Sequence, residues 1–211
     1  VLVPDKEGMM RDVVLGFDSI QDYLRFPSDL GATIGRYANR INQGRFVLDG
    51  TEYQLPQNNY GHCLHGGPRG FQYRVFDGLQ KNDRELQLTY LAKDGEEGFP
   101  GNLNCKVTMT LTDDNAIYIQ YEADTDKPTI INMTNHSYFN LDGDPSKNNS
   151  DYLLTVDADY YTPVDSTFMT TGELAAVDGT PMDFRTPAAI GGRMNLDFEQ
   201  LRNGHGFDHN W

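Results

Sequence analysis

Apolar and polar residues alternate along the middle of this chain, a pattern that predicts β-strands. In residues 102–112 every second residue is apolar: Leu103, Cys105, Val107, Met109 and Leu111. A period of two matches the pleat of a strand, in which successive side chains point to opposite faces. Residues 84–91 and 116–123 repeat the alternation, so we expect further strands there. Their inward-facing residues are expected to be Leu86, Leu88, Tyr90, Ile117, Ile119 and Tyr121.

Turn signals separate these strands. Asp113-Asp114-Asn115 predicts a tight hairpin, and Asp49-Gly50 within 46–55 predicts another, because this dipeptide suits a two-residue turn. A buried strand is expected over Thr129–Met133. Helical patterns are short and confined to 18–25 and 195–202. The pattern therefore predicts an all-β fold, a large antiparallel β-sandwich, with residues 1–211 forming a single domain.

Composition narrows the function classes. The chain is 38% hydrophobic, with 11 Phe and 12 Tyr, which is too apolar for a disordered protein. Its net charge of −14 argues against nucleic acid, since phosphate backbones require a basic surface, and disfavours anionic membranes. No apolar run is long enough to cross a membrane. The two cysteines, Cys63 and Cys105, are too few for a disulfide framework, and Cys105 is expected to be a buried thiol.

Four segments concentrate polar residues that can carry chemistry. They are GATIGRYANRI at 31–41 with Arg36, Asn39 and Arg40; HCLHGGPRGF at 62–71 with His62, Cys63 and His65; TNHSYFNL at 134–141 with Asn135, His136, Ser137 and Tyr138; and GHGFDHNW at 204–211 with His205, Asp208 and His209. Each residue taken singly has a structural role as its simplest interpretation. Together they suit a polyhydroxylated ligand, because sugar hydroxyls require donors and acceptors and sugar C–H faces contact aromatic rings.

Other chemistries fit the same segments less well. Zinc could use His62, Cys63 and His65, or His205 and His209, but Gly204 and Gly206 argue against the helix that would align the last pair, and two compact ligand pairs are missing. We therefore expect no metal. No dinucleotide or phosphate-loop fingerprint is present, and no serine lies in a G-x-S-x-G turn.

The same motifs, together with YTPVDSTFMTTGELAAVDGTPMDFR at 161–185, resemble the aldose 1-epimerases, or galactose mutarotases. The resemblance runs from the VPDKEGMMRDVVLGFD segment to Trp211, and five motifs occur in the family's order. It implies an antiparallel β-sandwich that binds a free sugar such as galactose or glucose in an open cleft. It also implies acid/base interconversion of the sugar's α and β anomers, without a metal or redox cofactor.

The resemblance also implies roles for particular residues. His136 would be the general acid that protonates the sugar ring oxygen, since imidazole has an ordinary pKa of about 6.5. His65 would orient the sugar and assist at the ring oxygen. Contacts with sugar hydroxyls and the shape of the pocket are expected from Asn39, Arg40, Ser137, Tyr138 and Asp208.

The chain departs from the family pattern in one respect. The family's general base is a glutamate downstream of GFDHN, and no glutamate here lies in a matching motif, so we expect the chain to be incomplete at both ends and inactive alone. Exposed sheet edges would then favour association.

Two alternatives stay open: a non-catalytic sugar-binding or regulatory domain, and a hexose-6-phosphate epimerase in which Arg36 or Arg69 holds the phosphate. The resemblance implies a cytoplasmic protein, with export as the alternative.

Overall fold

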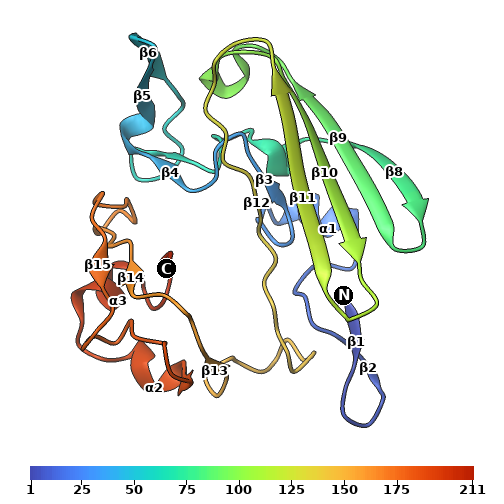
Figure 1. Cartoon of the computed structure of the whole chain (residues 1–211), viewed down its shortest axis with the longest axis vertical. Helices are drawn as coiled ribbons and strands as arrows, with labels where there is room; N and C mark the ends of the chain where they lie inside the picture. The colour runs from blue at the N-terminus through green and yellow to red at the C-terminus, as the bar shows by residue number, and fades with distance from the viewer. The chain divides into compact units, whose positions relative to one another are not determined.

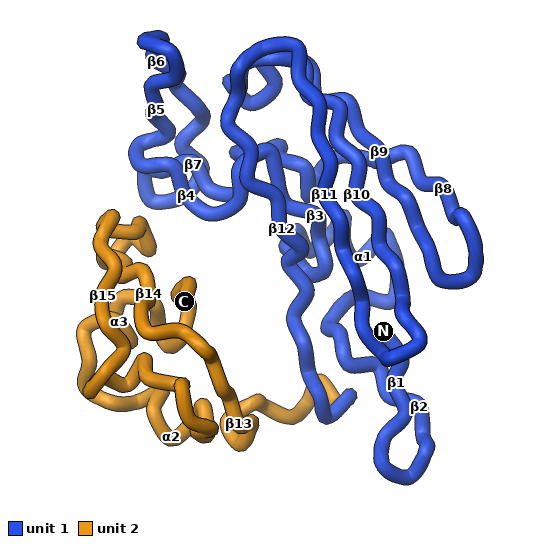
Figure 2. Tube along the Cα trace, in the orientation of Figure 1, with its two compact units in different colours: residues 1–143 blue, residues 144–211 orange.

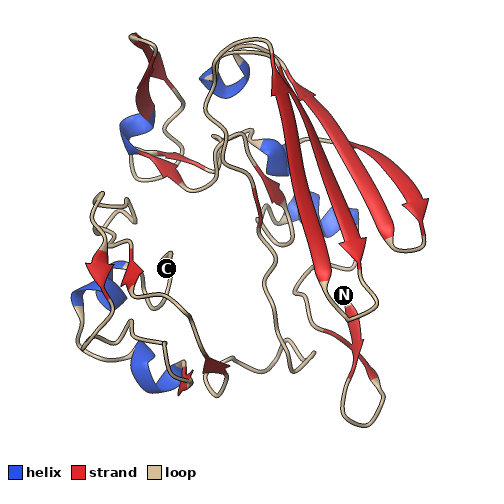
Figure 3. Ribbon diagram, in the orientation of Figure 1, coloured by secondary structure: helices blue, strands red, loops and turns tan.

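The computed structural model describes every residue from Val1 to Trp211. It divides the chain into two compact units, unit 1 from Val1 to Gly143 and unit 2 from Asp144 to Trp211 (Figure 2). Strands and loops dominate, and the few helices are short (Figure 3). The expected all-β fold is confirmed. The expectation that residues 1–211 form a single domain stays a prediction.

The largest sheet of unit 1 has four antiparallel strands in the order β11-β10-β9-β8 (Figure 1). Its strands are β8 (Asp77–Asn82), β9 (Glu85–Ala92), β10 (Leu103–Leu111) and β11 (Ile117–Thr125). In this register Cys105 lies opposite Tyr90 on one side and Ala123 on the other. The three strands and the hairpin turn at 113–115 predicted from alternation are therefore confirmed.

The apolar face of this sheet is covered along only part of its length. Leu103, Cys105 and Val107 are fully buried, whereas Leu111 is 48% exposed and Ile117 is 40% exposed. The last two line a cavity of about 770 Å³ near the tips of the hairpins. The prediction that Ile117 points inward was wrong, because alternation fixes the side of the sheet but not what packs against it.

Shorter elements complete unit 1. The predicted hairpin at 46–55 is confirmed as β5 (Arg45–Leu48) and β6 (Thr51–Gln54), joined through Asp49 and Gly50, whose φ angles of 49° and 76° are those of a type I′ turn. The predicted helix at 18–25 is confirmed as α1 (Ile20–Arg25), which begins after Ser19, whose side chain accepts the Asp22 N–H.

The remaining strands of unit 1 are paired in twos. β1 pairs with β2, β3 with β12, and β4 with β7. Their bounds are β1 Leu2–Pro4, β2 Met10–Asp12, β3 Thr33–Ile34, β4 Arg40–Ile41, β7 Cys63–Leu64 and β12 Thr134–Asn135. Short 3₁₀ turns are η1 (Asn42–Gly44), η2 (Phe71–Tyr73) and η3 (Glu96–Gly98).

The strand predicted over Thr129–Met133 was wrong. That segment forms only an isolated bridge, between Asn132 and Tyr37, and regular pairing begins at β12. Asn132 donates its N–H to the Arg36 carbonyl at 3.0 Å, and its carbonyl accepts the Ala38 N–H at 2.7 Å. The apolar run therefore follows residues 36–38 closely without forming a ladder.

The core of unit 1 consists of two clusters. One contains Ile41, Leu55, Cys63 and Phe99, and the other contains Phe71, Ala92, Leu103 and Cys105. Both cysteines are free and buried, as expected for Cys105. Burial raises the pKa of Cys63 to about 12 and that of Cys105 to about 11, so both are neutral thiols. The second cluster fixes Phe71 beside the polar loops described below.

Unit 2 has its own core and two short strand pairs. β13 (Leu153–Leu154) pairs with β16 (Ala188–Ala189), and β14 (Tyr160–Tyr161) pairs with β15 (Ala175–Ala176). Its helices are α2 (Gly191–Met194), which was not predicted, and α3 (Glu199–Asn203), which confirms the helix predicted at 195–202. The core contains Tyr161, Val177, Met182 and Leu201.

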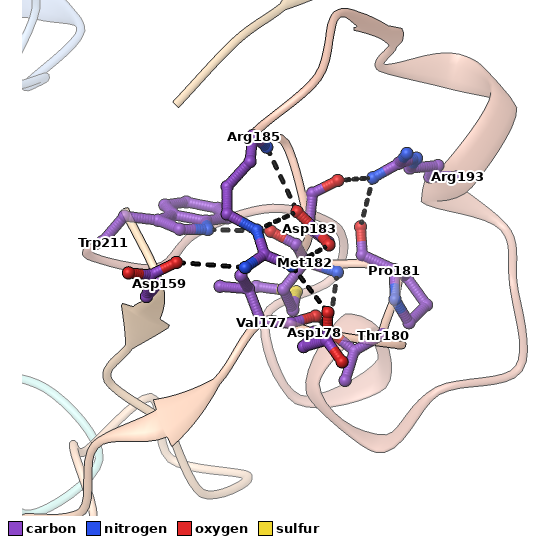
Figure 4. Close-up of polar contacts among 10 residues, drawn as sticks. All are labelled: Asp159, Val177, Asp178, Thr180, Pro181, Met182, Asp183, Arg185, Arg193 and Trp211. Carbon is purple, nitrogen blue, oxygen red and sulfur yellow. Dashed lines mark hydrogen bonds and ion pairs between the residues drawn. The ribbon is translucent and has the colours of Figure 1, made fainter. Parts of the chain in front are cut away.

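Arg185 ties together the surface loops of unit 2 (Figure 4). Its guanidinium donates to Asp159 at 3.0 Å, to Asp178 at 2.7 Å and to both carboxylate oxygens of Asp183. These contacts lower the pKa of Asp183 to about 2. The arginine of the MDFR motif is thus occupied with neighbouring carboxylates.

Candidate functional site

The pairing of β3 with β12 determines where His136 lies. The ladder continues beyond both strands, because His136 donates its N–H to the Ala32 carbonyl at 2.9 Å and its carbonyl accepts the Gly31 N–H at 3.1 Å. Ala32 in turn donates to the Asp29 carbonyl at 3.1 Å, which closes a turn. His136 therefore lies opposite the turn that contains Asp29.

His65 is held in the same way by β4 and β7. Its N–H donates to the Asn39 carbonyl at 3.0 Å, and the Asn39 N–H donates to Nδ1 of the His65 ring at 2.9 Å. Both residues have left-handed backbones, with φ of 52° at His65 and 62° at Asn39. Because Nδ1 accepts a hydrogen bond, the neutral His65 ring carries its proton on Nε2. His65 is therefore fixed as a hydrogen-bond donor through Nε2.

Gly66 allows this loop to pack closely. It has φ +80°, and a Cβ there would lie 2.0 Å from the Gly35 carbonyl oxygen. That same carbonyl accepts the Phe71 N–H at 3.0 Å. A side chain at 66 would thus force apart the IGR and LHGG segments, which explains why a glycine follows His65.

The two imidazoles meet in unit 1. The ring centroids of His65 and His136 are 5.2 Å apart with the planes at 82°, and the Tyr138 ring lies 5.0 Å from His136 on a tilted plane. One carboxylate oxygen of Asp29 and one nitrogen of each histidine lie within 4.8 Å of one another, and all three residues are half-buried. No hydrogen bond holds the His136 ring, whereas His65 is held through Nδ1. The sequence-predicted pair of histidines is thus brought together, with an aspartate that was not predicted.

Asn39 and Arg40 adjoin this pair through the backbone. The Asn39 Oδ1 accepts the Arg40 N–H at 2.8 Å. The Arg40 guanidinium donates from Nε at 3.1 Å and from Nη2 at 2.9 Å to Oδ1 of Asn59. Asn59 is a second residue that the sequence did not indicate, because it lies in a loop without a motif. It orients the guanidinium of Arg40.

Ser137 and Tyr138 follow directly after His136. The Ser137 N–H donates to Oδ1 of Asn135 at 3.1 Å, and the Tyr138 carbonyl accepts the Leu15 N–H at 2.9 Å. The Tyr138 side chain is 45% exposed, with its ring against His136. The backbone thus fixes this segment while leaving an aromatic surface beside the imidazole.

Asp208 lies in unit 2, where its side chain is exposed. The structure does not test its predicted contact with the sugar. Two neighbouring side chains contact the core of unit 2: Nε2 of His209 lies 3.2 Å from Oε1 of Gln200, and Trp211 donates from Nε1 to the Met182 carbonyl at 3.0 Å (Figure 4). Burial lowers the pKa of His209.

Two other candidates from the sequence, Arg36 and His62, form hydrogen bonds with backbone groups. Arg36 is 2% exposed and donates to the carbonyls of Pro100 at 2.7 Å and Gly101 at 3.0 Å, with its guanidinium 5.6 Å from the Phe99 ring centroid. Burial lowers its pKa. His62 accepts the Gln43 N–H through Nδ1 at 3.0 Å. Arg36 is therefore committed to backbone carbonyls.

The residues considered for zinc do not present a suitable set of ligands. Cys63 is a buried neutral thiol, and the Nδ1 lone pair of His62 is already used. Asp29, His65 and His136 are the residue types of a carboxylate and two-imidazole metal site. However, the fixed tautomer of His65 puts a proton, not a lone pair, on Nε2. The cluster is thus better suited to hydrogen bonding and proton transfer.

Comparison with known proteins identifies relatives along the whole chain. A family model for aldose 1-epimerase matches residues 1–211. Galactose mutarotase from Rattus norvegicus is 44% identical over 209 residues, which cover 99% of this chain and 59% of that protein. Aldose 1-epimerase from Escherichia coli (strain K12) is 42% identical over 207 residues, covering 98% and 59%. The chain thus spans 59% of the length of these curated relatives.

Solved structures give the same result for the fold. A crystal structure of an aldose epimerase homologue from C. elegans superposes with a TM-score of 0.87 at 35% identity, covering 94% of this chain and 60% of that one. Galactose 1-epimerase from Lactobacillus acidophilus superposes with a TM-score of 0.86 at 34% identity, covering 94% and 59%. None of the helices is both long and apolar enough to cross a bilayer.

Proposed function

The chain belongs to the aldose 1-epimerase family, and we propose that it supplies the acid side and much of the sugar-binding surface of an enzyme that interconverts the anomers of free hexoses such as galactose or glucose. The observation that carries the proposal is the difference between two facing imidazoles: His65 is fixed as a neutral donor, and His136 has no hydrogen bond to its ring. One ring is suited to orient a substrate and the other to exchange a proton.

The proposed reaction opens and recloses the sugar ring. On opening, the C1–O5 bond breaks, the C1 hydroxyl gives up its proton and its oxygen becomes the aldehyde oxygen. The ring oxygen O5 takes the bonding pair and receives a proton from His136. Rotation about the C1–C2 bond presents the other face of the aldehyde. The reverse steps close the ring, return the proton to His136 and give the other anomer.

The remaining predicted residues hold the sugar. His65 donates from Nε2 toward the ring oxygen, and Arg40, oriented by Asn59, donates to hydroxyls. Asn39, Ser137, Tyr138 and Asp208 remain proposed contacts. The proton of the C1 hydroxyl needs a base, which the resemblance assigns to a glutamate downstream of GFDHN, so no glutamate of this chain takes that role.

The burial of Arg36 weakens the alternative of a phosphorylated substrate. One of the two arginines considered for a phosphate already donates to backbone carbonyls, and Arg69 alone is left for it. Free hexoses are therefore the better candidates. The cytoplasmic location and the association through sheet edges stay predictions.

Polarimetry tests the proposed activity. Fresh α-galactose and α-glucose are added to the product of the whole reading frame and to its His136→Ala variant, with the uncatalysed rate in buffer as the reference. We expect the unaltered protein to speed mutarotation and the variant to lose most of this effect. A rate equal to that of buffer for the unaltered protein, or an unaffected variant, contradicts the proposal. NMR titration of the 211-residue chain with galactose separately measures binding without turnover.

A further inference from the structure

Asp29 is the one residue beside the two histidines to which neither the motifs nor the proposed function gives a role. It begins the turn that is closed by the Ala32 N–H, and His136 pairs with the same turn. One of its carboxylate oxygens lies within 4.8 Å of a ring nitrogen of both His65 and His136. The fold therefore directs a carboxylate toward the site from a third segment of the chain.

The carboxylate of Asp29 has an unused acceptor. Its Oδ1 is buried and accepts no hydrogen bond, and the side chain forms no ion pair. A buried acceptor without a partner is costly, and native proteins keep few of them unless a ligand or water completes the site. The charge of Asp29 acts on its surroundings: burial and then this negative charge raise the pKa of Tyr73.

The spacing suits a hydroxyl group between the carboxylate and the rings. A hydroxyl oxygen makes hydrogen bonds of about 2.8 Å on each side, so it bridges polar atoms that are about 4.5 to 5.5 Å apart. The observed separation is at most 4.8 Å. The three groups also complement a hydroxyl chemically, because Nε2 of His65 donates whereas the carboxylate accepts.

We infer that Asp29 is a substrate-binding residue whose carboxylate accepts a hydrogen bond from a hydroxyl flanking the sugar ring oxygen. This inference rests on the proposed function. If the ring oxygen lies at His136, the hydroxyls on the two adjoining branches are those on C1 and C6, so Asp29 accepts from one of these. A sugar that lacks this hydroxyl leaves the carboxylate without its partner, which makes Asp29 a determinant of specificity.

NMR titration of the 211-residue chain tests the inference. Dissociation constants are measured for galactose, 6-deoxygalactose and 1-deoxygalactose (1,5-anhydrogalactitol) with the unaltered chain and with Asp29→Asn. Asp18→Asn is the matched control, because Asp18 is an exposed carboxylate earlier in the same segment. Circular dichroism and Trp211 fluorescence verify that each variant is folded.

We expect Asp29→Asn to weaken galactose binding about tenfold, since hydrogen bonds to charged groups are the stronger ones, and Asp18→Asn to leave it unchanged. For one of the two deoxy sugars, the unaltered chain and Asp29→Asn should bind equally. That sugar identifies the hydroxyl. If Asp29→Asn does not fold, the carboxyl ¹³C signal of Asp29 is measured in the unaltered chain instead. Galactose should shift this signal, and one of the two deoxy sugars should not.

Three results overturn the inference while leaving the proposed function intact. They are unchanged galactose binding by a folded Asp29→Asn, equal weakening for all three sugars, and a carboxyl signal that galactose does not move. Micromolar zinc binding that is lost in both Asp29→Asn and His136→Ala would also overturn it, in favour of a metal site. If the unaltered chain binds no galactose, the proposed role of this chain in sugar binding fails, and the inference fails with it.

Discussion

His65 of unit 1 and His209 of unit 2 lie in similar glycine-rich sequence but in different surroundings. In unit 1, His65 and His136 face each other, and the ring of His136 makes no hydrogen bond. In unit 2, His209 contacts Gln200 and lies among the rings of Tyr161 and Trp211. An imidazole that supports the packing of its own unit is less available for proton transfer. We therefore propose proton transfer for the ring of His136 and a structural role for His209, whose Nε2 lies 3.2 Å from Oε1 of Gln200.

The largest expected effect is the loss of mutarotation rate when His136 is replaced. In the product of the whole reading frame, His136→Ala should lower kcat for galactose mutarotation by about 10²- to 10⁴-fold, the usual contribution of a general acid or base. Its stability should change little, because the half-buried ring makes no hydrogen bond. Polarimetry measures the rate and urea unfolding the stability. A rate within twofold of the unaltered protein would remove His136 from the mechanism.

The next effect concerns the packing that supports His65. Gly66→Ala should cost about 3 kcal/mol of unfolding free energy, because the new Cβ meets the Gly35 carbonyl in a left-handed backbone. Gly50→Ala is the control, since it also has positive φ but nothing within 4 Å, and it should cost about 1 kcal/mol. Urea denaturation followed by circular dichroism compares the two. Equal costs would show that the close contact at Gly66 is unimportant.

A smaller effect is expected in the pH dependence of stability, which depends on the buried ring of His209. Burial lowers the pKa of His209, so the unfolded chain binds a proton more readily there than the folded chain. Stability should therefore fall as the pH drops below about 6.5, by up to about 1 kcal/mol at pH 5.5, and His209→Gln should remove this part of the pH dependence. The nearby charge of Asp208 acts in the opposite direction and reduces the effect. Fluorescence of Trp211, the only tryptophan, follows the unfolding. Identical pH profiles for both proteins would contradict this account of His209.

Replacing Arg185 should change the stability at neutral pH least of all. Its contacts lower the pKa of Asp183 to about 2, below the ordinary value of 3.8, so their contribution is complete above pH 3.8 and is lost as the pH falls through about 2. Arg185→Met should shift the acid unfolding midpoint of unit 2 to higher pH, as followed by Trp211 fluorescence. An unmoved midpoint would mean that these exposed contacts contribute nothing measurable.

Local patterns predicted the regular elements well. Alternation located β9, β10 and β11, and Asp49-Gly50 identified its hairpin, because both signals depend only on neighbouring residues. The strand expected over Thr129–Met133 failed, since pairing depends on a distant partner and that segment follows residues 36–38 instead. The inward position expected for Ile117 was wrong for a similar reason, since its burial depends on what packs against the sheet.

The candidate site was predictable only where motifs mark it. The motifs supplied His65 and His136, and the structure brings them together. Asp29 and Asn59 carry no local signal, because their importance comes from pairing between strands far apart in sequence. Arg36 belongs to a motif, yet its motif alone does not distinguish a ligand contact from a buried guanidinium bound to carbonyls.

The proposed contact of His65 and His136 with the sugar is tested most directly by the imidazole signals of the 211-residue chain, followed by ¹H–¹⁵N NMR during a galactose titration. His62 is the internal reference, because its Nδ1 also accepts a backbone N–H but the residue has no proposed contact with the sugar. We expect galactose to shift the ring signals of His65 and His136 and to leave those of His62 in place. If these signals of His65 and His136 stay unmoved at saturating galactose, neither histidine contacts the sugar.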